Sequence, residues 1–171
     1  ETEKDLDYME SVLSAATLAR EYETLELIRR ELSDAGYLRV RKAAQRSKLQ
    51  KSKPSRFRTA SGMEVLAGRS NTENDYVTFT LAAKTDLWFH AKDIPGSHVV
   101  LLCRDRRPEK EDILEAAALA AYYSKAAASE NVPVDYTLVR HVKKPSGARP
   151  GMVTYTSQKT VYTDPKPPNV N

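Results

Sequence analysis

Hydrophobic residues recur at helical spacing through the first part of the chain. Both runs contain few large apolar side chains, so we expect this helical pair to pack on another helix or on the domain that follows. Gly36 comes directly after the second run and is expected to end that helix, because glycine readily adopts the left-handed conformation of a helix C-cap. The two runs are Leu6, Met9, Leu13 and Ala16, then Leu25, Ile28, Leu32 and Ala35.

From about residue 56 the apolar period changes from 3.6 to 2, which is typical of β-strands. The alternating stretches are separated by short polar segments that contain glycine, proline or serine. We predict strands at Met63–Ala67, Tyr76–Ala83, Leu87–Lys92, Ser97–Cys103, Val134–Val142, Met152–Thr156 and Lys159–Thr163.

One helix is predicted between the fourth and fifth strands. Pro108 suits a first helical turn, the acidic residues that follow favour the positive N-terminus, and the helix body runs from Ile113 to Ser129. Eight of the 21 residues from Glu109 to Ser129 are alanine, so this helix can lie close against a sheet. The pattern predicts an α+β fold: a largely antiparallel sheet with one long Ala-rich covering helix, preceded by an N-terminal helical segment.

Charge is distributed in blocks that agree with this division. Residues 1–35 carry four basic and ten acidic residues, whereas residues 36–58 carry nine basic residues and no acidic one. The basic block fits a contact with a polyanion, because Lys and Arg release counterions from phosphates, and it equally fits a solvated linker. We expect a helical segment and basic linker over residues 1–53 and a second unit over residues 54–171.

The composition excludes several classes of protein. With 171 residues, 40% of them hydrophobic and 29% charged, the chain suits one domain with a small addition rather than a disordered protein. No apolar run approaches the roughly 18 residues of a transmembrane helix, and the lone Cys103 cannot form an internal disulfide, so we expect a soluble, cytoplasmic protein. Because the sequence enters helical pattern directly at Glu1, we expect it to be part of a longer chain.

Candidate chemistry is concentrated between residues 86 and 98. If residues 86–92 form a strand, Leu87, Phe89 and Ala91 face a core. A turn follows at residues 93–97, where Pro95 and Gly96 suit a type II turn that exposes backbone N–H groups to an anion. The opposite face of the strand carries polar and aromatic side chains that are costly to bury, namely Asp86, Trp88, His90 and Lys92.

We interpret this face as a nucleic-acid surface. Trp88 would provide a stacking plane, His90 and His98 would form hydrogen bonds, and Lys92 with Ser97 and the turn amides would meet a phosphate. The supporting residues Asp86, Asp93 and Gly96 would orient His90 and shape the turn. The alternative is a structural role, with Trp88 buried and Asp86 hydrogen-bonded to His90.

A second basic stretch runs from Arg140 to Gly151 through a loop rich in proline and glycine. No acidic residue occurs from Tyr136 through Thr163. Side chains that could follow a phosphate backbone are Arg140, Lys143, Lys144 and Arg149. A solvated loop is the alternative.

Catalytic and metal chemistry are weaker interpretations. His90, His98 and His141, with Asp86 or Asp93, could bind zinc in principle, but they show no recognised ligand spacing. Ser97 and His98 are adjacent, and adjacent residues of a strand point to opposite faces. We therefore expect a binding domain without a metal, cofactor or catalytic site, and a nucleic-acid hydrolase is the weakest alternative.

Three motifs, in this order, resemble the NFACT-R domain, the C-terminal RNA-binding module of RqcH and fibronectin-binding protein A-like proteins. The resemblance extends from about Pro54 to Asp164, and residues 1–50 resemble the end of the preceding coiled-coil and middle region. The family's N-terminal NFACT-N domain is absent from this sequence and would be a partner within the same protein. The motifs are Asp86–Val100, Glu115–Ala126 and Val132–Gly151.

The resemblance implies a role in ribosome-associated quality control. Such proteins bind obstructed large ribosomal subunits and recruit alanyl-tRNA, which extends the stalled chain with C-terminal alanines, so the implied partners are tRNA and the large subunit. The family also includes proteins described as fibronectin-binding adhesins. A protein-binding module, with fibronectin as partner, is therefore the alternative function.

Overall fold

The structure is a computed structural model that describes residues 2–39 and 53–169. No helix in these two ranges is long and apolar enough to cross a membrane. The helices are α1 (Thr2–Leu18), α2 (Tyr22–Asp34), α3 (Asn71–Tyr76), the π-helical η1 (Val77–Leu81), α4 (Lys110–Tyr122) and the 3-10 helix η2 (Val139–His141). The strands are β1 (Ser55–Arg58), β2 (Glu64–Ala67), β3 (Leu87–Ala91), β4 (Val99–Leu102), β5 (Val132–Leu138), β6 (Val142–Lys143), β7 (Thr154–Tyr155) and β8 (Lys159–Thr163).

The fold is α+β, as predicted, with a six-stranded antiparallel sheet in the order β1-β2-β4-β3-β5-β8. A separate two-stranded ribbon joins β6 to β7. The central strand β4 is apolar along its whole length and buried on both faces. A strand of this composition requires cover on each side of the sheet, and the structure supplies it.

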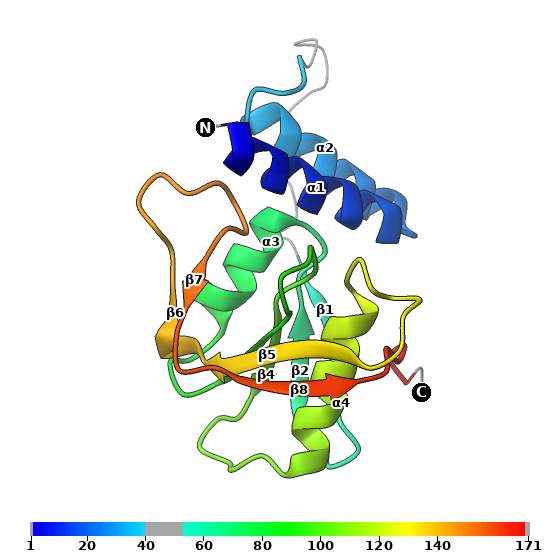
Figure 1. Ribbon diagram of the computed structural model, residues 1–171, viewed down its shortest axis with the longest axis vertical. Helices are drawn as coiled ribbons and strands as arrows, with labels where there is room; N and C mark the ends of the chain where they lie inside the picture. The colour runs from blue at the N-terminus through cyan, green and yellow to red at the C-terminus, as the bar shows by residue number, and fades with distance from the viewer. Residues whose placement is uncertain (1, 40–52, 170–171) are drawn as a thin grey trace.

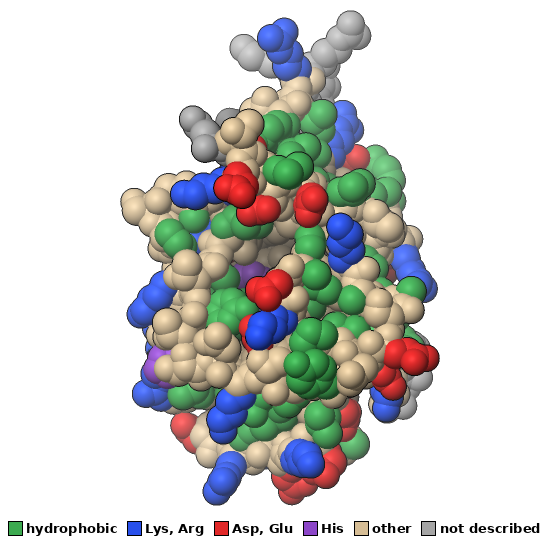
Figure 2. Space-filling model, viewed as in Figure 1, with side chains coloured by type: hydrophobic (Ala, Val, Ile, Leu, Met, Phe, Trp, Pro, Cys, Tyr) green, Lys and Arg blue, Asp and Glu red, His purple; other side chains and the backbone are tan. Residues whose placement is uncertain are grey.

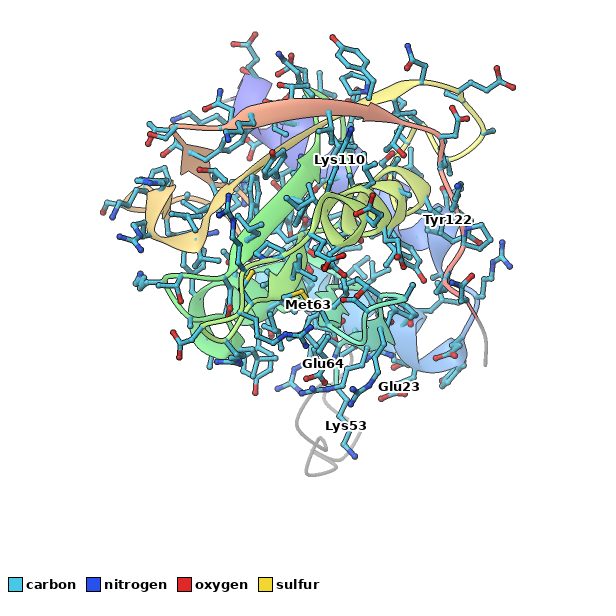
Figure 3. The ribbon with its side chains drawn as sticks, turned by 90° about the horizontal axis from the view of Figure 1, so that it is seen from below. Glu23, Lys53, Met63, Glu64, Lys110 and Tyr122 are labelled. Atoms are coloured by element: carbon cyan, nitrogen blue, oxygen red, sulfur yellow. The ribbon has the colours of Figure 1, made fainter. Side chains whose placement is uncertain are left out.

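Helix α4 covers one face of the sheet, and Lys110 and Tyr122 mark its two ends in Figure 3. Its alanines pack on Val65, Leu101 and Phe89 from three neighbouring strands. The helix begins with a capping box between Glu109 and Asp112, and it is shorter than predicted. It ends at Tyr122 because the residues that follow pair with the turn before β4: Ser97 N–H donates to Tyr123 O, and Lys125 N–H donates to Pro95 O.

The opposite face of the sheet is covered by α3, η1 and the β6–β7 ribbon (Figure 1). Leu66, Val100 and Trp88 form a cross-strand row on this face, and each is at most 1% exposed. Val77 from η1 and Val142 from β6 pack against the row. The sheet therefore has a hydrophobic core on both sides.

The helices α1 and α2 lie side by side above α3 (Figure 1). Gly36 has a φ of 83° and ends α2 as predicted, with Tyr37 N–H donating to Leu32 O. The pair is bound to the rest of the chain by polar contacts: Asn71 Nδ2 donates to Ser11 Oγ at 2.8 Å, and Thr72 N–H donates to Glu31 Oε2 at 3.1 Å. The expectation that the pair packs on the following unit is confirmed by these contacts.

The predicted strand over Tyr76–Ala83 is wrong, because this segment continues α3 as the π-helix η1. The helix is initiated by Ser70, whose Oγ accepts a hydrogen bond from Glu73 N–H at 3.2 Å. Strand β1 was not predicted: it lies at the sheet edge and alternates two exposed arginines with Ser55 and Phe57. The strand predicted over Val134–Val142 is interrupted by η2.

The basic linker predicted at the end of the segment 1–53 lies almost entirely outside the described residues. So does most of the positive block of residues 36–58. The division at residue 53 therefore stays a prediction.

Candidate nucleic-acid interface

A cleft of about 330 Å³ lies between α1, the turn after β3 and the segment that leads into β7. We call it the histidine cleft. Figure 2 shows a hollow in this face of the molecule, with histidine visible inside it and acidic side chains around it. The residues that line the cleft are Asp7, Glu10, Ser11, Asn71, Trp88, His90, Asp93, Ile94, Pro95, Gly96, His98, Gly151, Met152, Val153 and Tyr155.

Trp88 is 0% exposed, so it is a core residue of the second face and offers no open stacking plane. Its ring is parallel to that of His90, with centroids 5.7 Å apart, and Tyr155 lies at 4.8 Å. Its indole Nε1 has no hydrogen-bond partner among the described residues. The position of Trp88 therefore matches the alternative interpretation, in which Trp88 is buried and has a structural role. The edge of its ring still lines the cleft.

His98 is 1% exposed and is held from two sides by the α3–η1 segment. Asn74 Oδ1 accepts from His98 N–H at 3.0 Å, and Thr78 Oγ1 lies 2.9 Å from His98 Nδ1. Burial lowers the pKa of His98 well below 6.5, and repulsion from the Lys144 ammonium and from His90, when His90 is protonated, lowers it further. The imidazole is therefore neutral at physiological pH.

His90 is half-buried, and its ring meets that of His98 edge-on with centroids 5.6 Å apart. Burial also lowers the pKa of His90, while backbone hydrogen bonds at Ala91 and Gly96 and the charges of Asp135 and Asp93 oppose the shift. Both histidines of the cleft can therefore donate and accept hydrogen bonds without carrying charge.

Asp86 is fully buried and does not orient His90, contrary to our expectation. Its carboxylate accepts from Ala83 N–H at 2.7 Å, from Cys103 N–H at 2.8 Å and from Arg104 N–H at 3.3 Å. It therefore fixes the loop before β3 against the end of β4.

The turn between β3 and β4 differs from the predicted type II turn. The residue with positive φ is Asp93, at 55°, rather than Gly96. Gly96 is needed because the backbone passes close to the end of α4: a Cβ there would lie 3.0 Å from the Cβ of Ser124. The Ser97 N–H donates to Tyr123 O and is not free for an anion. Ser97 lines a different cavity, beside Tyr122 and Tyr123, so it is separated from His98.

The cationic side chains are not grouped in the cleft, since none of the described residues that line it is Lys or Arg. Lys92 is exposed beyond the end of β3. Lys144 Nζ is 2.8 Å from Asp75 Oδ2 and donates to Arg149 O at 2.6 Å. Arg149 itself pairs with Asp5 and lies over the rings of Tyr8 and Tyr37. Lys144 and Arg149 therefore hold the loop and the helical pair in place.

The remaining predicted cations, Arg140 and Lys143, are exposed at the other end of the sheet, on η2 and β6. Arg140 N–H donates to Lys84 O, and Arg104 Nη2 donates to Leu81 O. Leu81, Val139 and Val142 pack in one cluster beneath them. We call this group the basic corner: Lys84, Arg104, Arg140 and Lys143.

Sequence reasoning missed Lys84 and Arg104 because they belong to connections distant in sequence from Arg140. It also missed Phe79, which is 38% exposed on η1, because that segment was predicted to be a strand. Figure 2 shows Lys and Arg side chains spaced along the left and lower margins of the face, where Figure 1 places β6 and the loop leading to α4. Exposed cations suit contacts with the phosphates of a nucleic acid.

Among the described residues, no group of three or more His, Cys, Asp or Glu side chains is arranged to hold a metal ion. His90 and His98 lie in the cleft, whereas His141 lies on η2 beyond the end of β5. The three histidines considered as zinc ligands are therefore not brought together.

Comparison with known proteins agrees with the motifs noted in the sequence. The family described as NFACT protein RNA binding domain matches residues 53–157. The chain is 43% identical over 165 residues to the Rqc2 homolog RqcH of Bacillus subtilis (strain 168), covering 95% of this chain and 28% of that protein. It is 44% identical over 170 residues to the Rqc2 homolog RqcH of Streptococcus suis (strain 05ZYH33), covering 96% and 29%.

A solved structure is also similar, that of the C-terminal of the fibronectin/fibrinogen-binding protein from Streptococcus suis. The TM-score is 0.90 at 41% sequence identity, and the match covers 96% of this chain and 65% of that chain. The present chain thus spans less than a third of the length of the two RqcH proteins. With a family match that extends over more than half of its residues, this chain belongs to the NFACT protein RNA-binding domain family.

Proposed function

We propose that this chain is the RNA-binding part of a ribosome-associated quality-control factor of the RqcH type. The observation that carries the proposal is the family match over residues 53–157, together with identity above 40% to RqcH proteins along nearly the whole chain. The chain acts by binding and has no catalytic step of its own.

In its finer form, the proposal is that this domain helps to hold tRNA on obstructed large ribosomal subunits in the cytoplasm. The complete protein would recruit alanyl-tRNA and direct the addition of C-terminal alanines to the stalled chain. These steps need the rest of the protein, since this chain corresponds to 28% of its Bacillus relative.

The basic corner supports a contact with the RNA backbone. Its four cations come from two loops, η2 and β6, and the apolar cluster of Leu81, Val139 and Val142 packs beneath them. Phosphate contacts of this kind position an RNA without reading its sequence and make the affinity depend on salt. Phe79, 38% exposed on η1, offers a ring on which an unpaired base can stack, a contact worth about 1–3 kcal/mol.

The experiment that tests this proposal is crosslinking of the full-length protein to RNA in cells, followed by sequencing of the recovered RNA. We expect tRNA and large-subunit rRNA to be enriched over a control in which Lys84, Arg104, Arg140 and Lys143 are all replaced by Glu. Equal recovery with the two proteins would remove the basic corner from the interface. No enrichment of tRNA with the unaltered protein would contradict the proposed role.

A second function is favoured by one observation, the similarity to the C-terminal part of the fibronectin/fibrinogen-binding protein from Streptococcus suis. We propose as the alternative that this chain presents a protein-binding surface for fibronectin. Binding to immobilised fibronectin that persists after ribonuclease treatment and in the four-Glu variant would support the alternative. If fibronectin binding is lost in either condition, that binding depends on RNA or on nonspecific charge.

A further inference from the structure

The histidine cleft combines features that the phosphate-binding role of the basic corner does not use. Its rim carries the carboxylates of Asp7, Glu10 and Asp93, and none of the described residues that line it is Lys or Arg. A phosphate group is therefore repelled from the cleft. Its interior is formed by neutral imidazoles, an aromatic edge and apolar side chains, so the ligand it suits is an uncharged ring.

The size of the cleft limits that ligand. A volume of about 330 Å³ is at the low end of small-molecule pockets, which range over roughly 300–1,000 Å³. It suits one base with its sugar rather than a strand or a duplex. Half-buried His90 and Tyr155 supply ring surface, and Met152 and Pro95 supply apolar contact.

The hydrogen-bonding groups in the wall of the histidine cleft determine which polar atoms a ligand must carry at its edge. The carboxylates accept hydrogen bonds and therefore favour an amino group. Half-buried His90 is neutral and can donate or accept, whereas His98 is 1% exposed and already lies beside Thr78. Trp88 lines the cleft and its indole Nε1 has no partner among the described residues, but this atom is buried, so we assign it no direct bond to the ligand. A ligand that presents an amino group satisfies the carboxylates of the rim.

We propose that the histidine cleft binds a single unpaired nucleobase that carries an exocyclic amino group, with the acidic rim accepting from that group and the base lying against His90 and Tyr155. Adenine, cytosine and guanine have such a group, whereas uracil does not. Single-stranded RNA is commonly recognised through splayed bases that stack on rings and are read at their edges. This inference rests on the proposed RNA-binding function and adds base discrimination to the phosphate contacts made elsewhere.

The cleft also depends on α1, which contributes Asp7 and Glu10 to the rim. Ser11 on the same helix accepts from Asn71 Nδ2 at 2.8 Å, which fixes α1 against α3 at the edge of the cleft. The helical pair is therefore a part of the site, and not only a connection to it.

Trp88 is the single tryptophan of the chain, so its indole N–H gives one resolved NMR signal inside the cleft. We would titrate the full 171-residue chain with adenosine, cytidine, guanosine and uridine. The expected result is that the three amino-bearing nucleosides shift the indole signal with affinity at least tenfold higher than uridine. The double variant Glu10→Gln and Asp93→Asn should lose this preference, and Glu3→Gln on the same helix, outside the cleft, should keep it. Asn is tolerated at the positive φ of Asp93.

Several outcomes would overturn the inference. The first is an indole signal that no nucleoside shifts, and the second is a response to uridine as strong as that to the other three nucleosides. The third is a selective response to Nα-acetyl-arginine amide, which would assign the cleft to a basic protein side chain. Binding of an RNA oligonucleotide is measured in parallel. RNA binding that persists with no base preference removes the inference and leaves the proposed function intact, whereas a nucleoside response without any RNA binding contradicts the proposed function alone.

Discussion

The hydroxyl oxygen of Thr78 lies 2.9 Å from Nδ1 of His98, and both side chains are fully buried. The contact links the π-helical segment to the residue just before β4, at the inner wall of the histidine cleft. His98 is thereby held in one orientation, and its backbone N–H donates to Asn74 of α3, the helix that η1 continues. The imidazole belongs as much to the fold as to the cleft.

Stability should fall on mild acidification because of these histidines. Burial lowers the folded-state pKa of His98 well below 6.5 and also lowers that of His90, whereas both titrate near 6.5 in the unfolded chain. As pH falls through 6.5, the unfolded state takes up protons that the folded state does not, so the free energy of unfolding decreases until the folded-state pKa is reached. We expect a lower melting temperature at pH 5 than at pH 7.5, measured by circular dichroism.

The control for this effect compares two histidine variants. His98→Gln should flatten the dependence of melting temperature on pH between 7.5 and 5, and His141→Gln, outside the cleft, should leave it unchanged. If His98→Gln does not fold, His90→Gln provides the same comparison. Equal slopes in the wild type and in the cleft variants would show that other groups cause the pH dependence.

Local pattern predicted most of the sheet and its covering helix. The alternation of Leu87 and Phe89 with Trp88 and His90 correctly assigned β3 and its two faces. The same reasoning failed at residues 76–83, where Val77 and Leu81 also alternate with polar residues. The N-cap at Ser70, with Glu73 three residues later, was the local signal that could have identified the helix.

The candidate site was predictable only in part, because its contacts are distant in sequence. Trp88, His90 and His98 converge as expected from neighbouring strands. Lys143 and Lys144 are adjacent lysines, yet only Lys144 is half-buried, in an ion pair with Asp75, 69 residues away. No local pattern indicates that α1 brings carboxylates over the cleft, since this depends on how the helical pair docks.

Trp88→Ala should act on stability rather than directly on a stacking contact. Trp88 is 0% exposed in the row with Leu66 and Val100, and removal of a large buried aromatic side chain costs about 3–5 kcal/mol. Urea unfolding should show this loss, and Tyr162→Ala, with the Tyr162 side chain 63% exposed, should cost far less. A Trp88→Ala protein as stable as the wild type would contradict the burial described here.

Lys143 and Lys144 should behave differently on charge reversal, although they are adjacent. Lys143 is exposed in the basic corner, so Lys143→Glu should weaken RNA binding and reduce the slope of log affinity against log salt by roughly 0.7–0.9, the value for one phosphate contact. Lys144→Glu instead breaks the pair with Asp75 and should lower the melting temperature. Fluorescence anisotropy across a salt series, with melting curves for both variants, checks the difference. An unchanged salt slope in Lys143→Glu would exclude Lys143 from the interface.

Arg149→Ala should loosen α1 and α2 from the rest of the chain. The Arg149 guanidinium pairs with Asp5 and lies 5.3 Å from the ring centroid of Tyr8 and 5.2 Å from that of Tyr37, so it connects the helical pair to the loop before β7. Hydrogen exchange should become faster in α1 and α2 and stay unchanged in the sheet. Arg149→Lys should restore only part of the protection, because an ammonium lacks the planar surface that stacks on the two rings.

The matched control is Arg140→Ala, since Arg140 is exposed on η2 and forms no ion pair with α1 or α2 among the described residues. Asp5→Asn combined with Arg149→Ala should cost less than the sum of the two single changes, because each removes the same contact. Additive effects, or unchanged exchange in α1 and α2 of Arg149→Ala, would show that Asn71 and Thr72 hold the helices without Arg149. Because α1 forms one wall of the histidine cleft, the same Arg149 variant should also weaken any nucleoside response of the Trp88 indole signal.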